Sequence, residues 1–266
     1  MRRAFSALPL WLFGLIWALP LLYAVWSAVH PPVYSTIFDP LAPLTWRNFV
    51  QAWNEAPFAR YFLNTIFLVC FTVFSQCVLA TLAGFAFARL RFPGRDLLFA
   101  ALLLQLMISP GILLVWNYRE ISWLGLADTI PAMGIPYLGS ALGIFLLRQN
   151  FRTIPSELDD AARLEGCSLL GRLWKVYVPL SRGTYVAFAL TSVAYHWNDF
   201  LWPLVVSDSV TTRPLTVGLE IFATPDQGVQ WSLVTAATLL SSAPLLIAFL
   251  IFQRQFVQSF LRAGIR

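Results

Sequence analysis

The distribution of hydrophobic and polar positions divides this chain into six apolar windows separated by polar segments. A helix of about 20 apolar residues is long enough to cross the ~30 Å hydrocarbon core of a membrane. Windows close to that length cover residues 8–29, 62–87, 97–117, 132–147, 184–207 and 232–252. The pattern therefore predicts an all-α polytopic membrane bundle with six transmembrane helices, forming one domain over residues 1–266.

The fourth window, AMGIPYLGSALGIFLL, is short and contains Pro136 and three glycines. Proline disrupts the helical hydrogen-bond ladder, and small residues let helices approach closely in lipid. We therefore expect this span to be kinked or to pack tightly against a neighbour. A closed β-barrel is not favoured, because its strands would alternate apolar and polar residues.

The composition agrees with a membrane protein. Hydrophobic residues make up 58% of the chain and charged residues 12%, with a mean hydropathy of +0.69, whereas a soluble domain carries about 25% charged residues. The start, MRRAFSALPLWLFGLIWALPLLYAVW, has the charge pattern of a signal peptide, but its apolar core is too long and no clear A-x-A cleavage site follows. We interpret this segment as an uncleaved first span.

Positive charges predict the orientation of the bundle, because cytoplasmic segments are enriched in Arg and Lys. With the N-terminus in the cytoplasm, 14 of the 18 basic residues fall in cytoplasmic segments. The four outer ones are Arg47, Arg60, Arg119 and Arg213. Both termini are therefore predicted to be cytoplasmic. The net charge of +5 follows from this topology, so we expect no nucleic-acid partner.

Groups suited to catalysis or metal binding are sparse. The chain has two histidines, His30 and His196, no H-E-x-x-H motif, and no second acid within a span to pair with Asp199. The three cysteines form no disulfide framework. We therefore expect no metal site and no enzymatic activity of this chain's own.

One polar segment, ELDDAARLEGCSLLGRLWKVYVPL, interrupts the apolar pattern on the predicted cytoplasmic side. Ser156-x-x-Asp159 has the spacing of a capping box, which predicts a helix that begins at about Glu157. Gly166 is expected to end this helix, since glycine commonly follows the last helical turn.

A second helix is predicted directly after it. Ser168 can cap the amphipathic sequence LLGRLWKVYV, and Pro179 is expected to break that helix. These two helices fit either a solvated connector or a docking element. The adjacent small residues Ala161 and Ala162 favour docking, because a connector would carry long polar side chains there.

The cytoplasmic segment also resembles a known signature. Asp160-Ala161-Ala162, Gly166 and Val178-Pro179-Leu180 match the E-A-A, glycine and hydrophobic-proline pattern of the membrane permease subunits of bacterial ATP-binding-cassette (ABC) importers, in particular the maltose and multiple-sugar type. Asp160 replaces the usual glutamate, which keeps the charge but shortens its reach. LAGFAFARLRFPGRD, WNDFLWPLVV and RPLTVGL resemble family segments in the same order, and the resemblance runs from about residue 8 to the end.

The resemblance implies a division of labour in a bacterial inner membrane. Such permeases work as two similar six-helix subunits beside a cytoplasmic ATPase dimer, fed by an extracytoplasmic solute-binding protein. This chain has no G-x-x-x-x-G-K-[ST] motif. ATP and Mg²⁺ are therefore expected on the partner ATPase, and no cofactor on this chain.

Residues 155–180 then correspond to the family's coupling segment, which is seated on the ATPase and moves as the ATPase dimer closes and opens. Ala161 and Ala162 would let the ATPase approach the helix backbone closely. Gly166 would permit the turn into the second helix, and Asp160 would make a polar contact with the ATPase. The residues expected to couple to the ATPase are Glu157, Asp160, Ala161, Ala162, Gly166 and Pro179. The C-terminal QSFLRAGIR is also expected to reach the ATPase side.

Polar residues within the spans are candidates for the translocation path. Asp199 is the only acid within a predicted span, and a charge there is costly unless it faces a cavity, a partner or the interface. It either caps a helix break before Pro203 or pairs with an outer arginine, or it lines the path together with Asn198. The other candidates are Trp197 and Trp202, as stacking surfaces for sugar rings, and Gln105, Asn117 and Tyr118. Asn64 and Gln76 are expected to form interhelical hydrogen bonds.

The substrate is left open between a disaccharide, an oligosaccharide, an amino sugar and glycerol phosphate or a related polyol phosphate. No basic residue lies well inside a span, which favours a neutral sugar. An ion-driven secondary transporter could use Asp199, but it would not need a helix that docks on a cytoplasmic partner.

Overall fold

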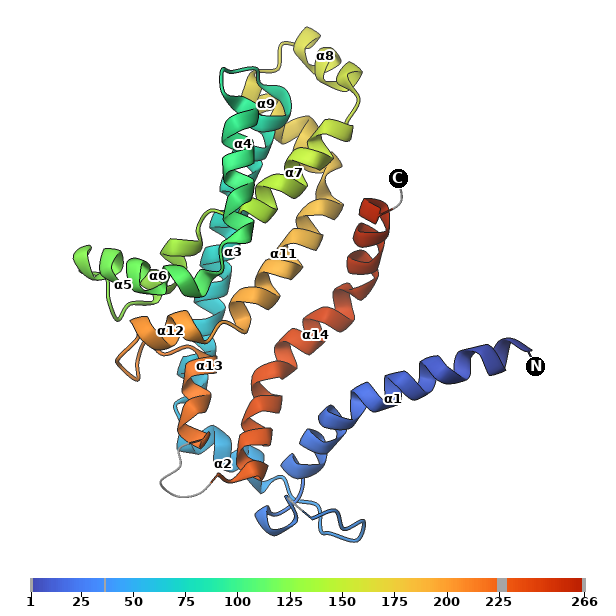
Figure 1. Cartoon of the computed structure of the whole chain (residues 1–266), viewed down its shortest axis with the longest axis vertical. Helices are drawn as coiled ribbons and strands as arrows, with labels where there is room; N and C mark the ends of the chain where they lie inside the picture. Colours follow the sequence, from blue (N-terminus) through green and yellow to red (C-terminus); the bar gives the residue numbers. More distant parts are fainter. Residues whose placement is uncertain (1, 36, 224–228, 265–266) are drawn as a thin grey trace. The chain divides into compact units, whose positions relative to one another are not determined.

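The structure, a computed structural model, describes residues 2–35, 37–223 and 229–264, with side chains described over 13–35, 37–222 and 229–253. All regular elements in this part of the chain are helical (Figure 1). The α-helices are α1 Arg2–Ala28, α2 Arg47–Glu55, α3 Phe58–Arg89, α4 Arg95–Leu104, α5 Leu114–Trp123, α6 Ile130–Gly134, α7 Ala141–Thr153, α8 Ser156–Leu164, α9 Leu169–Arg172, α10 Val178–Leu180, α11 Arg182–Trp197, α12 Leu201–Val206, α13 Leu215–Gly218 and α14 Trp231–Gly264.

Short turns of tighter or wider helix connect several of them. The 3₁₀ turns are η1 Pro32–Tyr34, η2 Gln105–Met107, η3 Pro110–Leu113, η4 Ile135–Tyr137 and η6 Leu219–Ala223. The element η5, Leu173–Tyr177, is a π-helix. The prediction of an all-α architecture is confirmed for the described residues.

The chain divides into two compact units. Unit 1 comprises residues 1–62 and 214–246, and unit 2 comprises residues 63–213 and 247–266. Two of the three boundaries fall inside the long helices α3 and α14, and the third falls between α12 and α13. A single transmembrane domain over residues 1–266 stays a prediction.

Two of the predicted spans are single long helices. Phe58–Arg89 and Trp231–Gln253 are each long and apolar enough to cross a membrane, and they contain the second and sixth windows. Two bent helix pairs, one for each of the third and fourth windows, raise the number to four if each pair is counted as one span. Six spans therefore stay a prediction, because the described residues supply up to four by length and composition.

The third window does not form the straight helix expected over residues 97–117. Arg95–Met107 and Pro110–Trp123 meet at an angle of 93°. Ser109 has an extended conformation, with φ −67° and ψ 131°. A residue before proline avoids the helical region, and Pro110 itself has no N–H to continue the ladder, so the chain turns at this point.

The fourth window is bent by 49° between Ile130–Tyr137 and Ala141–Thr153, which confirms the expected kink. Its glycines also permit close packing. A Cβ atom at Gly143 would lie 2.6 Å from the Phe188 ring on α11, and one at Gly134 would lie 2.8 Å from the Thr72 hydroxyl on α3. Larger residues at these positions would separate α7 from α11 and α6 from α3.

The fifth window is interrupted as well. α11 ends at Trp197, and the chain runs through three residues before α12 begins at Leu201. The Asn198 amide donates to the Ala194 carbonyl at 2.7 Å, which satisfies an acceptor left open at the end of α11. The fifth window is therefore not one continuous helix, and the helix break before Pro203, which the sequence left open, is present.

Unit 2 has a hydrophobic core at each end. Near α8 and α9, α3 contributes Ala80 and Phe85, α7 contributes Ile144, Leu147 and Phe151, and the following segments contribute Ile154, Leu173 and Tyr177. Near α5, α6 and α12, the second core contains Leu68, Ile121, Ala132, Met133, Trp202 and Val206. Figure 1 shows these two groups of short helices at opposite ends of unit 2. Each candidate site described below lies at one of these ends.

In unit 1, polar contacts join α2 to the end of α1. The Asn48 amide donates to the carbonyls of Ala28 and His30 at 2.8 and 2.7 Å. The His30 ring stacks on Trp26 with 3.8 Å between centroids. These contacts fix the end of α1 against α2, although the side chains at positions 2–12 of α1 are not described.

Candidate functional site

α8 is the helix predicted to dock on a partner, and the structure places its start at Ser156 with Pro155 as the N-cap. No side-chain cap is present, so the predicted capping box of Ser156 and Asp159 is wrong. The Asp159 carboxylate turns instead toward Arg172 and Arg163. It therefore cannot bond back to the first N–H groups of the helix.

The end of α8 and the start of α9 follow the prediction. Gly166 has φ +77°, a left-handed conformation that glycine adopts at little steric cost. Its N–H donates to the Arg163 carbonyl, and the Cys167 N–H donates to the Ala162 carbonyl. These are the two hydrogen bonds of a Schellman motif. The Ser168 hydroxyl accepts from the Gly171 N–H at 3.1 Å, so Ser168 caps α9 as expected.

Pro179 does not break the second helix. The chain remains helical from α9 through η5 and α10 to Leu180, and the interruption falls at Ser181. In the π-helix the Val178 N–H donates to the Leu173 carbonyl, five residues back. This wider turn shifts the carbonyls that a proline ring would otherwise meet, so Pro179 is accommodated.

An ion pair between α8 and α9 was not predicted. A nitrogen of Arg172 lies 2.7 Å from a carboxylate oxygen of Asp159, and these side chains are 10% and 8% exposed. Arg163, 58% exposed, lies 3.2 Å from the same oxygen. The acids at 157, 159 and 160 look alike in the sequence, and only the turn at Gly166 brings Arg172 back to one of them.

The residues predicted to couple to the ATPase differ in accessibility. Glu157, Asp160 and Ala161 are exposed, and Asp160 has only a 3.9 Å contact with Arg163. Ala162 is 8% exposed and packs against its own chain. The exposed face of α8 therefore offers one alanine flanked by acids, rather than two alanines.

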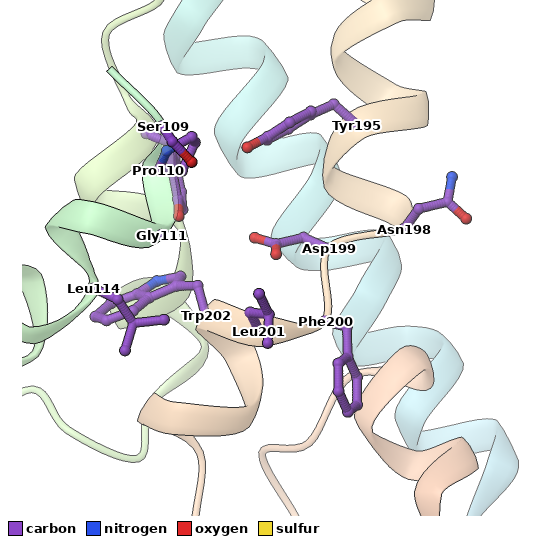
Figure 2. A pocket seen from close by; sticks show the side chains of 11 residues that line it. Ser109, Pro110, Gly111, Leu114, Tyr195, Asn198, Asp199, Phe200, Leu201 and Trp202 are labelled. Atoms are coloured by element: carbon purple, nitrogen blue, oxygen red, sulfur yellow. The ribbon is translucent and has the colours of Figure 1, made fainter.

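The other end of unit 2 contains a cavity of about 500 Å³. It lies between the proline turn at residues 109–111 and the break between α11 and α12 (Figure 2). Both interruptions of helix described above therefore contribute to one hollow. The described lining residues are Ser109, Pro110, Gly111, Leu114, Tyr137, Tyr195, Asn198, Asp199, Phe200, Leu201 and Trp202.

Asp199 bonds to the start of α12 and lines the cavity, and its place on a translocation path stays a prediction. Its carboxylate accepts hydrogen bonds from the backbone N–H groups of Phe200 and Trp202, at the start of α12. It also points toward residues 109–111 across the cavity, whereas the amide group of Asn198 points away from that side (Figure 2). The carboxylate thus fixes the helix break while it lines the cavity.

Trp202 lines the cavity, whereas the remaining path candidates lie elsewhere. Trp202 is 2% exposed, and its indole N–H donates to the Met133 carbonyl at 3.1 Å. Trp197 is 8% exposed and is not among the described lining residues. Both rings are covered by their own chain, so neither presents a stacking face in this conformation. Gln105, Asn117 and Tyr118 are also not among the described residues that line the cavity.

Sequence reasoning missed Tyr137 and Tyr195, which line the cavity. The Tyr137 backbone is held by Gln76, whose amide donates to its carbonyl at 2.7 Å. Gln76 also accepts from the Ser192 hydroxyl and lies 3.1 Å from a ring nitrogen of His196. The predicted interhelical bonds of Gln76 are confirmed. The signal for the tyrosines lay in the proline and glycine breaks nearby, which expose side chains at helix ends.

The loop that follows α12 is organised by Asp128. This residue has φ +58°, and its carboxylate accepts from the N–H groups of Asp208 and Ser209, at 2.9 and 3.0 Å, and from the Thr212 hydroxyl. The Asn64 amide donates to the carbonyls of Thr211 and Arg213 in the same loop. Asn64 therefore bonds to a loop and not, as predicted, to another helix.

Acidification is expected to release this loop. The hydrogen bond from Thr212, followed by that from the Ser209 backbone, lowers the pKa of Asp128 to about 2 from its ordinary 3.8. The ionised carboxylate therefore stabilises the loop above about pH 4, and this contribution is lost as the pH falls through about 2. Hydrogen exchange at the Ser209 amide, corrected for intrinsic rates, should rise in that interval. Asp128→Asn should abolish the pH dependence and Asp208→Asn should not; an equal effect of both would contradict the assignment.

The predicted C-terminal contact cannot be placed, because the side chains of residues 254–266 lie outside the described part of the chain. The same holds for the first and the last two residues, on which the predicted cytoplasmic location of the termini depends.

Comparison with known families gives one match over most of the chain. Residues 54–262 match the family described as "Binding-protein-dependent transport system inner membrane component". This range contains α8, α9 and all the described residues that line the cavity.

Curated relatives extend the similarity to the whole length. The arabinooligosaccharides transport system permease protein of Halalkalibacterium halodurans is 30% identical over 280 residues, with all of both chains covered. The sn-glycerol-3-phosphate transport system permease protein of Yersinia pestis is 29% identical over 223 residues, which cover 81% of this chain and 79% of that one.

Solved structures share the fold. A bacterial ABC transporter involved in the import of the acidic polysaccharide alginate matches with a TM-score of 0.84, 22% identity, and 95% coverage of both chains. The alginate transporter in complex with its alginate pentasaccharide-bound periplasmic protein matches with a TM-score of 0.68 and 16% identity, with 96% of both chains covered.

Proposed function

Because this chain belongs to the family of binding-protein-dependent transport system inner membrane components, we propose that it is a permease subunit of an ABC importer for a neutral sugar or oligosaccharide. The chain forms half of the translocation path, and a second, homologous permease forms the other half. An ATPase dimer, which binds ATP and Mg²⁺, docks from the cytoplasm. A solute-binding protein delivers the substrate from outside, and both termini lie in the cytoplasm.

The lining of the cavity carries the proposal for the substrate class. The described lining residues supply a carboxylate at Asp199 and the two tyrosines, with no arginine or lysine among them. Such groups can hydrogen-bond the hydroxyls of a sugar, and aromatic rings can pack against its apolar faces. A phosphorylated substrate would lack a cationic partner here and would be repelled by Asp199.

The proposal for coupling rests on α8. Its exposed side offers Ala161, where a partner surface can approach the backbone closely, together with the carboxylates of Glu157 and Asp160 for basic residues of the partner. Gly166 and the ion pair of Asp159 with Arg172 connect this helix to α9, and η5 and α10 connect α9 to α11. ATP hydrolysis biases the bundle between two states because the partner holds α8 differently in each.

Reconstituted transport tests this proposal. The chain, its companion permease, the ATPase and the solute-binding protein are placed in proteoliposomes, and uptake of labelled arabinose and maltose oligosaccharides is compared with that of glycerol 3-phosphate. We expect ATP-dependent uptake of a neutral sugar, and complete loss of uptake with an ATPase that cannot hydrolyse.

Two results would contradict the proposal in different ways. Transport of glycerol 3-phosphate in place of every neutral sugar would overturn the substrate class and leave the importer intact. Uptake that persists with an ion gradient and an inactive ATPase would identify an ion-driven transporter instead.

A further inference from the structure

Five arginines gather around the turn between α3 and α4 and the end of α7, all within unit 2. They are Arg89, Arg91, Arg95, Arg148 and Arg152. Each lies just beyond a predicted end of the second, third or fourth span. This level of a membrane protein is where the phosphate groups of the lipids lie.

Two of these arginines are engaged by the fold itself. Arg89 donates to the carbonyls of Phe151, at 2.8 Å, and Ile154. The guanidinium of Arg148 lies 3.9 Å from the centre of the Phe99 ring, and Arg148 is 8% exposed. Their charges are built into the packing of α3, α4 and α7.

Arg91 and Arg95 line an open cavity of about 410 Å³ at the turn, and the charge of Arg152 acts on Asp96 beside them. Its described lining is Arg91, Phe92, Gly94, Arg95, Asp96 and Leu97. Arg91 is exposed and has no hydrogen bond or ion pair within the described structure, whereas Arg95 pairs with Asp96 at 3.1 Å. α4 also starts here without a side-chain cap, so its N-terminal N–H groups add to the positive field.

The charge around this cavity is not balanced by its neighbours. Burial lowers the pKa of Arg148, and the charges of Arg152 and Arg95 lower it further, because these cations are close enough to repel one another. Asp96 is the one carboxylate that acts on this group in the described structure. Within the described structure, Arg95, Arg148 and Arg152 thus outnumber the carboxylate of Asp96, which leaves a site that favours a further anion.

Apolar surface adjoins the same cavity. Leu97 is 75% exposed and Leu98 is 55% exposed, at the start of the third apolar window. A soluble phosphate would gain nothing from these side chains, whereas a phospholipid places acyl chains beside them and its phosphate beside the arginines. We propose that the cavity lined by Arg91, Arg95 and Leu97 binds the phosphate of an anionic phospholipid, such as phosphatidylglycerol, from the leaflet on that side.

Native mass spectrometry of the purified permease–ATPase complex tests this site, with phosphatidylglycerol or phosphatidylcholine added in detergent. We expect the complex to retain phosphatidylglycerol in preference to phosphatidylcholine. Arg91→Gln should reduce its apparent affinity about fivefold, and Arg91→Gln with Arg152→Gln about 25-fold, which corresponds to about 1 kcal/mol per arginine near an anionic surface. Arg91→Lys keeps the charge and should retain most of the binding.

Arg119→Gln is the matched control, because Arg119 is an exposed arginine on the predicted outer side. An equal loss with Arg119→Gln, or no loss with Arg91→Gln, would overturn the site. Displacement of the lipid by inorganic phosphate at equal concentration would indicate a soluble ligand and overturn the lipid assignment. Dissociation of the ATPase from the Arg91→Gln complex with lipid binding unchanged would assign the patch to a protein contact. The measurement reads bound lipid and is independent of transport.

Discussion

Replacement of Ala161 by tryptophan is expected to lower ATP-driven uptake by about 5- to 150-fold, which is the change that the loss of a typical coupling free energy produces. Ala161 is exposed on α8, so an indole there meets no part of its own chain but occupies the space into which the proposed ATPase surface must fit. The measurements are uptake and ATP hydrolysis in proteoliposomes, with the amount of folded permease checked by size-exclusion chromatography. Hydrolysis without uptake, or loss of the ATPase from the complex, is the expected signature.

Neighbouring positions supply the controls for this experiment. Ala161→Ser adds one small group and should leave uptake nearly unchanged. Ala162→Trp is unsuitable, because Ala162 is 8% exposed and a large ring would disturb α8 itself. Gly166 is also ambiguous, since its φ of +77° strains any larger residue. Normal uptake with Ala161→Trp would refute the docking role of this face.

Removal of the Asp159 carboxylate is expected to loosen the whole coupling segment. Asp159→Asn leaves Arg172, 10% exposed, without its ionic partner. The loss of one member of a buried pair destabilises by about 3–5 kcal/mol, and we expect the lower end because Arg163 keeps part of this site in contact with solvent. Hydrogen exchange of the α8 and α9 amides in the intact complex should rise accordingly, and uptake should fall with it.

A double substitution distinguishes the effect of the two charges from the effect of side-chain volume. Asp159→Leu together with Arg172→Leu removes both charges at once, and exchange should return most of the way to that of the native chain. Asp160→Asn is the matched control, since Asp160 is exposed and has only a 3.9 Å contact with Arg163. If Asp159→Asn and Asp160→Asn behave alike, the pair does not hold α8 to α9.

The long apolar helices could be predicted because their signal is local. A run of about 20 apolar residues has few alternatives to a membrane helix, and the second and sixth windows coincide with α3 and α14. The Schellman turn at Gly166 and the cap at Ser168 were equally predictable, because each depends on a few consecutive residues. Other details differ: the third and fifth windows are interrupted, and Pro179 does not break its helix. In each case a proline or a polar residue was present, but neighbouring packing decided whether the chain would bend, break or widen into a π-turn.

The sequence by itself determined the class of this protein through its apolar windows, its basic segments and a segment, turned at a glycine and predicted to be cytoplasmic, that resembles a coupling motif. Only the tertiary structure decided which residues act together. The acids at 157, 159 and 160 are equivalent in one dimension, yet Asp159 is buried against Arg172 while Asp160 stays exposed, because the turn at Gly166 reverses the chain. Likewise the 109–111 turn and Asp199 are about 90 residues apart in the sequence and line one cavity, because two helix breaks lie at the same end of unit 2. Contacts between distant residues depend on how the helices bend, and hydrophobic periodicity does not carry that information.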